Sequence, residues 1–231
     1  DSQVRRVMGR EYGKGWEKRF DEFDYQPIAA ASIGQVHRVL TRDGRDLALK
    51  IQYPGVAKSI NSDVDNMAMF LRMANILPVE MDVSGIVAET KRQLKQEADY
   101  LVEARYLRHY RELVRDEARF VVPEVHDDFT TKRILAMDFV SGDPLESLGE
   151  DGVPQALRDD IGELLERLMF RELFEFQTMQ TDPNFANYFY QPGSDRVVLL
   201  DFGSTITFEK AFTERYKDIS RALIEEDDGA V

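Results

Sequence analysis

The spacing of apolar and polar residues predicts short strands near the start of the chain. Residues 47–52 alternate after a polar turn at residues 42–45, which is typical of the second strand of a hairpin. Residues 23–52 as a whole predict three short strands, and residues 121–125 and 133–138 predict two more. Residues 1–22, which precede them, predict a leading helix.

Helical periodicity accounts for most of the remaining chain, and no internal repeat is visible. The predicted helices span residues 53–76, 83–115, 155–177 and 208–226. The second is the longest, because it contains no proline and Pro78 breaks the chain before it. Strands and helices in this order predict an α+β fold.

Three oxygen-bearing side chains in the second half of the chain have a distinctive spacing. Asp182 and Asn187 lie five residues apart, and Asp201 follows fourteen residues after Asn187, at the end of a short apolar run. Protein-kinase-like enzymes space a catalytic-loop Asp, a metal-binding Asn and the Asp of D-F-G in this way. Such oxygen ligands suit Mg²⁺ held against phosphates. The alternative is a pair of ordinary turns, which Asp and Asn also favour.

Lys50 lies on the alternating strand at residues 47–52. A kinase uses a strand lysine to hold the α- and β-phosphates, and an acidic residue on a helix fixes that lysine. The long predicted helix offers three acidic residues, Glu97, Asp99 and Glu103. The alternative is a solvated acidic face whose partners are the basic residues of the same helix.

The segment before the hairpin, residues 27–37, is rich in alanine where a kinase would place G-x-G-x-x-G. It contains Ala29, Ala30, Ala31 and Ser32, with one glycine at Gly34. Its amides and the serine hydroxyl could still meet phosphates, with a geometry different from that of a glycine-rich loop. Taken alone, it is a turn of small residues.

These segments together resemble the UbiB (AarF) family of atypical kinase-like proteins. The matching stretches are A-A-A-S-I-G-Q-V-H at residues 29–37, A-L-K-I-Q-Y-P-G-V at 48–56, Q-E-A-D-Y-L-V-E-A at 96–104, Q-T-D-P-N-F-A-N at 180–187 and L-D-F-G at 200–203. The Gln-Thr variant is closer to the mitochondrial and related bacterial branch than to members with His-x-Asp-Pro-His. The resemblance implies a two-lobed protein-kinase-like fold.

The resemblance also implies a role for each matching residue. Lys50 would bind phosphates and pair with Glu103, and Asp182 would take the catalytic-loop position. Asn187 and Asp201 would hold Mg²⁺. The other implied nucleotide contacts are Ala29, Ala30, Ala31 and Ser32 of the alanine-rich loop, Glu97 and Asp99 near the phosphates or a metal, and the hinge from Met137 to Val140 beside the adenine.

Members of the family are associated with ubiquinone biosynthesis, ATPase activity and peripheral attachment to membranes. The resemblance therefore implies ATP or ADP and Mg²⁺ as ligands, and a prenyl-quinone precursor or a lipid as a further partner. It implies a location in the cytoplasm or at the membrane surface of a bacterium, or on the matrix face of a mitochondrion.

The motifs divide the chain into a leading helical segment at residues 1–22, an N-lobe at 23–139 and a partial C-lobe at 140–231. The K-x-G-Q motif of the family's N-terminal extension does not occur in this sequence, and few helices can follow D-F-G. We therefore expect a missing N-terminal extension and a shortened C-terminal lobe. No A-P-E follows D-F-G, which argues against a conventional protein kinase.

Composition limits the partners of the chain. A net charge of −13 over 231 residues makes nucleic acid an unfavourable partner. The chain has no cysteine, so it has no disulfide framework, and no apolar run approaches the length of a membrane span. Basic residues in the first twenty positions could touch anionic lipid, although a solvated helix is the preferred interpretation.

Three functions stay open. The first is a catalytic ATPase or small-molecule kinase, favoured by the complete Lys, Asp, Asn and Asp set. The second is a non-catalytic nucleotide-sensing module that binds a lipid or a protein, favoured by the alanine-rich loop. The third is an antibiotic- or choline-type phosphotransferase, against which the alanine-rich loop and the E-x-D-Y-x-x-E-A motif argue.

Overall fold

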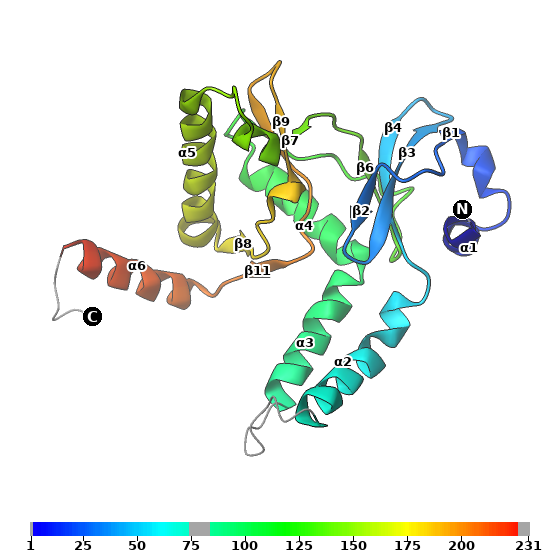
Figure 1. The fold of residues 1–231 in the computed structure, drawn as a ribbon, viewed down its shortest axis with the longest axis horizontal. Coiled ribbons are helices and arrows are strands. Elements are labelled where there is room, and N and C mark those ends of the chain that lie inside the picture. The colour runs from blue at the N-terminus through cyan, green and yellow to red at the C-terminus, as the bar shows by residue number, and fades with distance from the viewer. Residues whose placement is uncertain (1, 74–83, 226–231) are drawn as a thin grey trace. The chain divides into compact units, whose positions relative to one another are not determined.

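The structure, a computed structural model, describes residues 2–73 and 84–225 of the chain. Its helices and strands form two compact units (Figure 1). The first comprises Asp1–Glu112 and Val122–Val140, and the second comprises Leu113–Val121 and Ser141–Val231. Each unit combines helices with β-sheet, which confirms the expected α+β class.

An antiparallel sheet of five strands forms the centre of the first unit. Its strands are β1 (Phe20–Phe23), β2 (Ala29–Ala31), β3 (Gly34–Thr41), β4 (Asp46–Gln52) and β6 (Ile134–Asp138). Their order is β1-β3-β4-β6, with β2 also paired to β3. The expected hairpin is formed by β3 and β4, and Thr41 N donates to the Arg45 carbonyl oxygen at 2.9 Å to close its turn.

The leading helix is shorter than the sequence predicted. Helix α1 (Ser2–Glu11) is followed by a 3-10 turn at Trp16–Arg19, and β1 begins at Phe20. Gly13 and Gly15 have left-handed backbones, with φ of 84° and 78°, which residues other than glycine rarely adopt. This geometry ends the helix. Strand β1 consequently adds a fourth strand to the three predicted in this part of the chain.

Helix α1 and the sheet enclose the core of the first unit. The alternation of β4 places Leu47, Leu49 and Ile51 in this core, and none of the three is more than 2% exposed. Burying each such side chain contributes about 1.5–3 kcal/mol relative to leaving it in water. The other members of the core are Val4, Val7, Met8, Trp16, Phe20, Val39, Phe129, Ile134 and Ala136. The opposite face of β4 carries Lys50.

Helix α2 (Val56–Met73) begins three residues after the predicted start at residue 53. It lies beside α3 (Ser84–Glu97) (Figure 1), and Lys91 of α3 forms an ion pair of 2.6 Å with Asp65 of α2. The predicted end of the first helix near residue 76, Pro78 and the predicted start of the second at residue 83 lie outside the described residues.

The prediction of one continuous helix as far as residue 115 is wrong, because α3 is followed by a separate helix, α4 (Tyr100–Leu113). The Ala98 carbonyl oxygen, which a continuous helix would use, accepts from Gln52 Nε2 at 3.0 Å and from Arg133 Nη1 at 2.7 Å. Asp99 Oδ1 accepts from Leu101 N at 3.1 Å and caps α4. Bonds to distant residues therefore divide the helix.

The second unit holds a four-stranded sheet and a two-stranded sheet. The first has the order β5-β10-β9-β7, formed by β5 (Phe120–Val121), β10 (Arg196–Leu199), β9 (Tyr188–Gln191) and β7 (Asp143–Pro144). The second pairs β8 (Thr178–Gln180) with β11 (Thr205–Thr207). The helices of this unit are α5 (Gln155–Arg171) and α6 (Lys210–Ile224), with 3-10 turns at Leu145–Gly149 and Phe185–Asn187.

The prediction of one strand over residues 121–125 is wrong. Val121 pairs with β10 in the second unit, whereas Val125 forms an isolated bridge with Met137 in the first. Pro123 stands between them and has no N–H to donate to a ladder. The chain therefore leaves one sheet and joins the other within these residues.

The last two predicted helices form with changed boundaries. Helix α5 passes into a π-helical turn at Glu172–Phe176, and Gln177 ends it with a positive φ of 54°. Helix α6 begins at Lys210 rather than residue 208, and residue 226 lies outside the described residues. Judged by length and apolar content, no described helix qualifies as a membrane span.

Gly34 has no room for a side chain. A Cβ there would clash with the Ile51 carbonyl oxygen and lie 3.0 Å from Tyr100 Oη. We expect Gly34→Ala to lower the free energy of unfolding by at least about 1–3 kcal/mol, because the obstacle is backbone that cannot rotate away. Urea denaturation measures this, with Gly9→Ala in α1 as the control, where no atom lies within 4 Å. Equal stability of the two variants would contradict the packing described.

His37 makes the stability of the first unit depend on pH. The side chain is fully buried, Nδ1 donates to the Asp24 carbonyl oxygen at 2.7 Å, and Nε2 lacks a partner in the described structure. Burial lowers the pKa of His37 below its ordinary value, against the hydrogen bond to Asp24.

As the pH falls through about 6.5, His37 therefore becomes protonated in the unfolded chain while it stays neutral in the folded chain. We expect the stability contribution of His37 to be fully present above about pH 6.5 and lost as the pH falls toward the lower folded pKa. The free energy of unfolding should fall more steeply between pH 7.5 and 5.5 in the wild type than in His37→Gln. Identical slopes would show that His37 titrates normally.

Candidate functional site

Strand β4 and helix α4 bring a lysine and a glutamate together inside the first unit. Lys50 Nζ lies 2.8 Å from Glu103 Oε1, and the two side chains are 8% and 2% exposed. The ring centroid of Tyr100 lies 5.5 Å from the same ammonium. The contact that the family resemblance implied is therefore present. Because both charges are buried, loss of either partner would leave the other uncompensated.

The alanine-rich segment is a short strand and a tight turn. Ala29–Ala31 is strand β2, in which Ala30 pairs with Gln35 of β3. At the following turn, Ser32 Oγ donates to Glu97 Oε1 at 2.6 Å, so the last residue of α3 holds this turn. Contact between these residues and phosphates stays a prediction.

Asp99 has a local structural role beside its predicted one. In addition to capping α4, its Oδ2 lies 3.7 Å from Lys132 Nζ. Glu103, four residues later, is buried and contacts Lys50, so the two acids have different partners. A role for Asp99 near phosphates or a metal stays a prediction.

The two residues predicted to lie beside adenine are at the end of the first unit. Met137 pairs with Ala48 of β4 and is 6% exposed, and Val140 is half-buried. Phe139 N donates to the Asp46 carbonyl oxygen at 3.0 Å, which holds the backbone that leaves β6. Contact of Met137 and Val140 with adenine stays a prediction.

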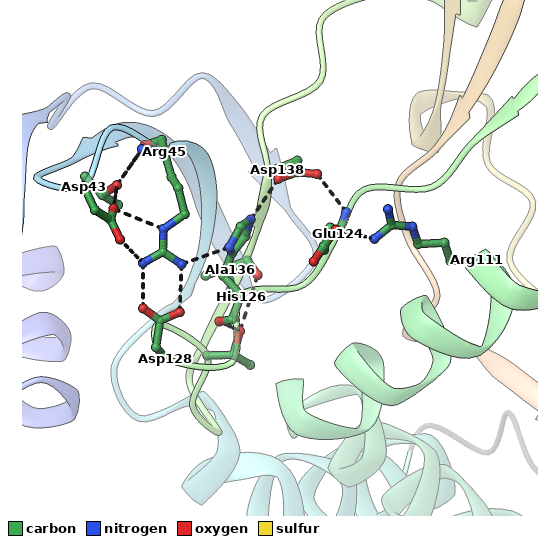
Figure 2. A network of polar contacts seen from close by, with 10 residues as sticks. Asp43, Arg45, Arg111, Glu124, His126, Asp128, Ala136 and Asp138 are labelled. Atoms are coloured by element: carbon green, nitrogen blue, oxygen red, sulfur yellow. Dashed lines mark hydrogen bonds and ion pairs between the residues drawn. The ribbon is translucent and has the colours of Figure 1, made fainter.

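A polar network fixes the same end of β6 (Figure 2). Asp138 accepts from His126 Nε2 at 2.8 Å and from Glu124 N at 3.1 Å. Arg45 Nη1 donates to His126 Nδ1 at 3.1 Å, and Arg45 binds both carboxylate oxygens of Asp128 at 3.0 and 2.7 Å. Because a guanidinium only donates, the neutral imidazole carries its proton on Nε2.

The network continues at the surface. Arg45 also binds Asp43, and hydrogen bonds from Arg45 and Thr41 lower the pKa of Asp43 to about 2. At the other end, Arg111 Nη1 donates to Glu124 Oε2 at 2.7 Å (Figure 2). Exposed pairs of this kind contribute little to stability, so the network orients the strand end more than it stabilises the unit.

In the second unit, hydrogen bonds to backbone carbonyl oxygens hold two loops together. Thr181 donates to the Ser204 carbonyl oxygen from both N (2.9 Å) and Oγ1 (2.6 Å). Leu200 N donates to the Asn187 carbonyl oxygen at 3.1 Å. The loop that carries Asp182 is therefore fixed along the segment that carries D-F-G.

These bonds place two of the predicted residues at one pocket. Asn187 and Asp201 both line it, together with Glu172 and Gln180. Asp201 is half-buried, and its Oδ1 accepts from Gly203 N at 2.9 Å. Asp182 is exposed and does not line this pocket.

Several carboxylates lie near Tyr188, which lines the same pocket. Burial raises the pKa of the Tyr188 phenol to about 12, and nearby carboxylates add to the shift. These carboxylates belong to Glu172, Asp182 and Asp201. Negative charges near one another favour a bound cation, so these carboxylates suit a cation at this pocket.

The oxygen donors fit a Mg²⁺ ion shared with phosphates. Asn187 offers an amide oxygen and Asp201 a carboxylate, whereas no described group of three or more His, Cys, Asp or Glu side chains could hold a metal alone. Mg²⁺ is commonly bound by one or two protein carboxylates together with substrate phosphates. We therefore keep Asn187 and Asp201 as the predicted ligands.

The sequence profile of the ABC1 atypical kinase-like domain matches residues 1–231, which is the whole chain. The chain belongs to this family. The resemblance to UbiB (AarF) proteins is thereby confirmed. A solved structure of an Rv3197–erythromycin complex from Mycobacterium tuberculosis matches with a TM-score of 0.77 and 30% identity, covering 98% of this chain and 59% of that one. This match supports the kinase-like α+β fold expected of the family.

Relatives of the ABC1 chain include named mitochondrial proteins. It is 41% identical to "Atypical kinase coq-8, mitochondrial" of Caenorhabditis elegans, over 97% of this chain and 30% of that protein. It is 37% identical to "Atypical kinase COQ8, mitochondrial" of Saccharomyces cerevisiae, over 94% of this chain and 43% of that protein. The chain thus spans less than half the length of these relatives.

Sequence reasoning missed one residue at the pocket of this ABC1 domain. Glu172 is 6% exposed although it is charged, and it lines the pocket with Asn187 and Asp201. It lies in the π-helical turn after α5, which the sequence presented as ordinary helix. A glutamate among other acidic residues at a helix end gives no indication that it is buried. The interruption of the apolar stripe after Arg171 is only a weak indication of the π-helical turn.

Proposed function

We propose that this ABC1 chain binds ATP or ADP with Mg²⁺ and catalyses ATP hydrolysis or phosphoryl transfer to a small molecule. The observation that carries the proposal is the buried ion pair of Lys50 and Glu103. A buried pair is weak support for stability, because desolvation offsets its attraction. Kinases use such a pair to present the lysine to the phosphates, which accounts for its presence here.

Each predicted residue has a task in this proposal. The Lys50 ammonium would contact the α- and β-phosphates, with the amides of the alanine-rich turn and the Ser32 hydroxyl beside them. Asp182 would accept the proton of the attacking water or hydroxyl. Asn187 and Asp201 would hold Mg²⁺, which when bound would neutralise phosphate charge.

We further propose that the activity supports ubiquinone (prenyl-quinone) biosynthesis. The support is membership of the ABC1 family and the similarity to mitochondrial COQ8 proteins. A prenyl-quinone precursor or a lipid would be the partner, met at a membrane surface. The chain covers only part of those relatives, so these partners belong to the proposal.

A nucleotide-sensing module is the second candidate. The contact of Ser32 with Glu97 and the pairing of β2 with β3 favour it, because both engage groups that a catalytic phosphate loop would offer to the nucleotide. Such a module would bind ATP or ADP without turnover and pass the signal to a lipid or a protein.

Turnover separates the two candidates. We expect the chain to hydrolyse ATP in the presence of Mg²⁺, with stimulation by a quinone-precursor mimic or by liposomes. Asp182→Asn should slow turnover by about 100-fold, the lower limit for general base catalysis. The effect is small because positioning and electrostatic stabilisation supply most of the catalysis of phosphoryl transfer. It should leave ATP affinity unchanged, since Asp182 would act on the nucleophile.

The control is Asp151→Asn, which makes the same change of charge at an exposed position away from the pocket. Equal turnover of Asp182→Asn and the wild type would remove Asp182 from the mechanism. ATP binding by the wild type without turnover in any of these conditions would identify the sensing module.

A further inference from the structure

A small pocket in the first unit collects positive charge. It has a volume of about 90 Å³ and lies between α1 and the connection from β4 to α2. Its charged lining consists of Arg6, Arg10, Lys58 and Arg133, with Glu11 as the one carboxylate. None of these residues has a role in the proposed nucleotide site.

The four cations differ from most other arginines of the chain. Arg38, Arg45 and Arg119 each bind a carboxylate within 2.6–2.7 Å. By contrast, the four cations of the pocket form no ion pair with any described residue. The whole chain has a net charge of −13, so carboxylates to pair with them are plentiful. Like charges gathered in one recess repel each other, and a bound anion would relieve that repulsion.

Part of this pocket is rigid. Arg133 Nη1 donates to Gln52 Oε1 at 2.9 Å and to the Ala98 carbonyl oxygen at 2.7 Å, and Gln52 is 2% exposed. These bonds fix the guanidinium before any ligand arrives, which lowers the entropic cost of binding. Helix α2 starts at Val56 with no acidic residue in its first turn, so its free N–H groups add to the positive potential.

We propose that this pocket binds a phosphate group, carried either by a small phosphomonoester or by a phospholipid headgroup. Guanidinium groups suit phosphate because they donate two parallel hydrogen bonds to its oxygens. The pocket volume of about 90 Å³ leaves room for one phosphate group. The site does not include Lys50 and shares no lining residue with the Asn187–Asp201 pocket, so it does not depend on the proposed catalysis.

The test compares two double variants of the full chain. Arg6→Gln/Arg10→Gln removes two cations from the pocket, on exposed positions of α1 whose replacement keeps the helix propensity. Lys14→Gln/Lys18→Gln removes the same charge from neighbouring exposed residues that do not line the pocket. Arg133 is left intact because its bonds to Gln52 and Ala98 also hold the fold.

Two probes distinguish the sources of the phosphate. One is inorganic phosphate, titrated into the protein by calorimetry at low salt. The other is vesicles of phosphatidylcholine with one part in five of phosphatidic acid, compared with pure phosphatidylcholine vesicles. We expect at least one probe to bind the Arg6/Arg10 variant at least about tenfold more weakly than the wild type and the Lys14/Lys18 variant.

This pattern with inorganic phosphate identifies a site for free phosphomonoesters, and the same pattern with vesicles alone identifies a headgroup site. Equal weakening in both double variants would mean that only general charge attracts the probe, which overturns the proposal. Absence of wild-type binding to both probes also overturns it. The affinity for ATP should be the same in all three proteins, which shows that the variants remain folded.

Discussion

Replacing Glu103 with glutamine is expected to destabilise the first unit by about 3–5 kcal/mol, because it leaves the Lys50 ammonium buried without a counter-charge. The same change should weaken ATP binding, since Lys50 would lose the group that holds it. Lys50→Met should have similar effects by leaving the carboxylate alone. Chemical denaturation and calorimetric ATP titration measure the two consequences separately.

A double-mutant cycle tests whether the two residues act as one unit. Lys50→Met/Glu103→Gln removes both charges, so its loss of stability should be smaller than the sum of the two single losses by a coupling of about 0.5–3 kcal/mol. It should bind ATP no worse than Lys50→Met. The matched control is the more exposed pair of Lys91 and Asp65, which should couple by at most about 1 kcal/mol. Strict additivity of the stability losses for Lys50 and Glu103 would contradict their action as one unit.

Asp201→Asn is expected to remove the dependence of nucleotide binding on Mg²⁺. A bound Mg²⁺ is the largest local charge at a phosphate site, and Asp201 is its predicted carboxylate ligand. Changes to residues that only support a metal ligand cost about 10–100-fold in metal affinity, so loss of the ligand itself should cost at least about 100-fold. The measurement is the affinity for ATP at several Mg²⁺ concentrations.

The control for Asp201→Asn is again Asp151→Asn, which keeps the pocket intact. Wild-type-like Mg²⁺ dependence in Asp201→Asn would assign the metal to other oxygens, for which Glu172 at the same pocket is a candidate. A loss of ATP affinity in Asp151→Asn as large as in Asp201→Asn would instead point to a general effect of charge.

Local patterns predicted the parts of the fold that depend on local forces. The β3–β4 hairpin follows from the alternation of residues 47–52 after a turn that contains Gly44, and both are visible in the sequence. The break between α3 and α4 was not predictable in the same way. It depends on Gln52 and Arg133, which are distant in sequence and take the Ala98 carbonyl oxygen.

The candidate site likewise has a part that the sequence predicts and a part that only the packing of separate elements determines. The spacing of Asp182, Asn187 and Asp201 is visible in the sequence, and two of the three residues line one pocket. The contact of Ser32 with Glu97 and the burial of Glu172 depend on how separate elements pack. Because sequence periodicity carries no information on such packing, only the structure reveals them.

Calorimetric titration of the wild-type chain with ATP, once in excess Mg²⁺ and once in excess chelator, tests the central claim most directly. The buried lysine of the first unit and the oxygen donors of the second predict binding in Mg²⁺ that weakens at least about tenfold in chelator. An absence of ATP and ADP binding in both conditions would contradict the proposal that this ABC1 chain binds nucleotide.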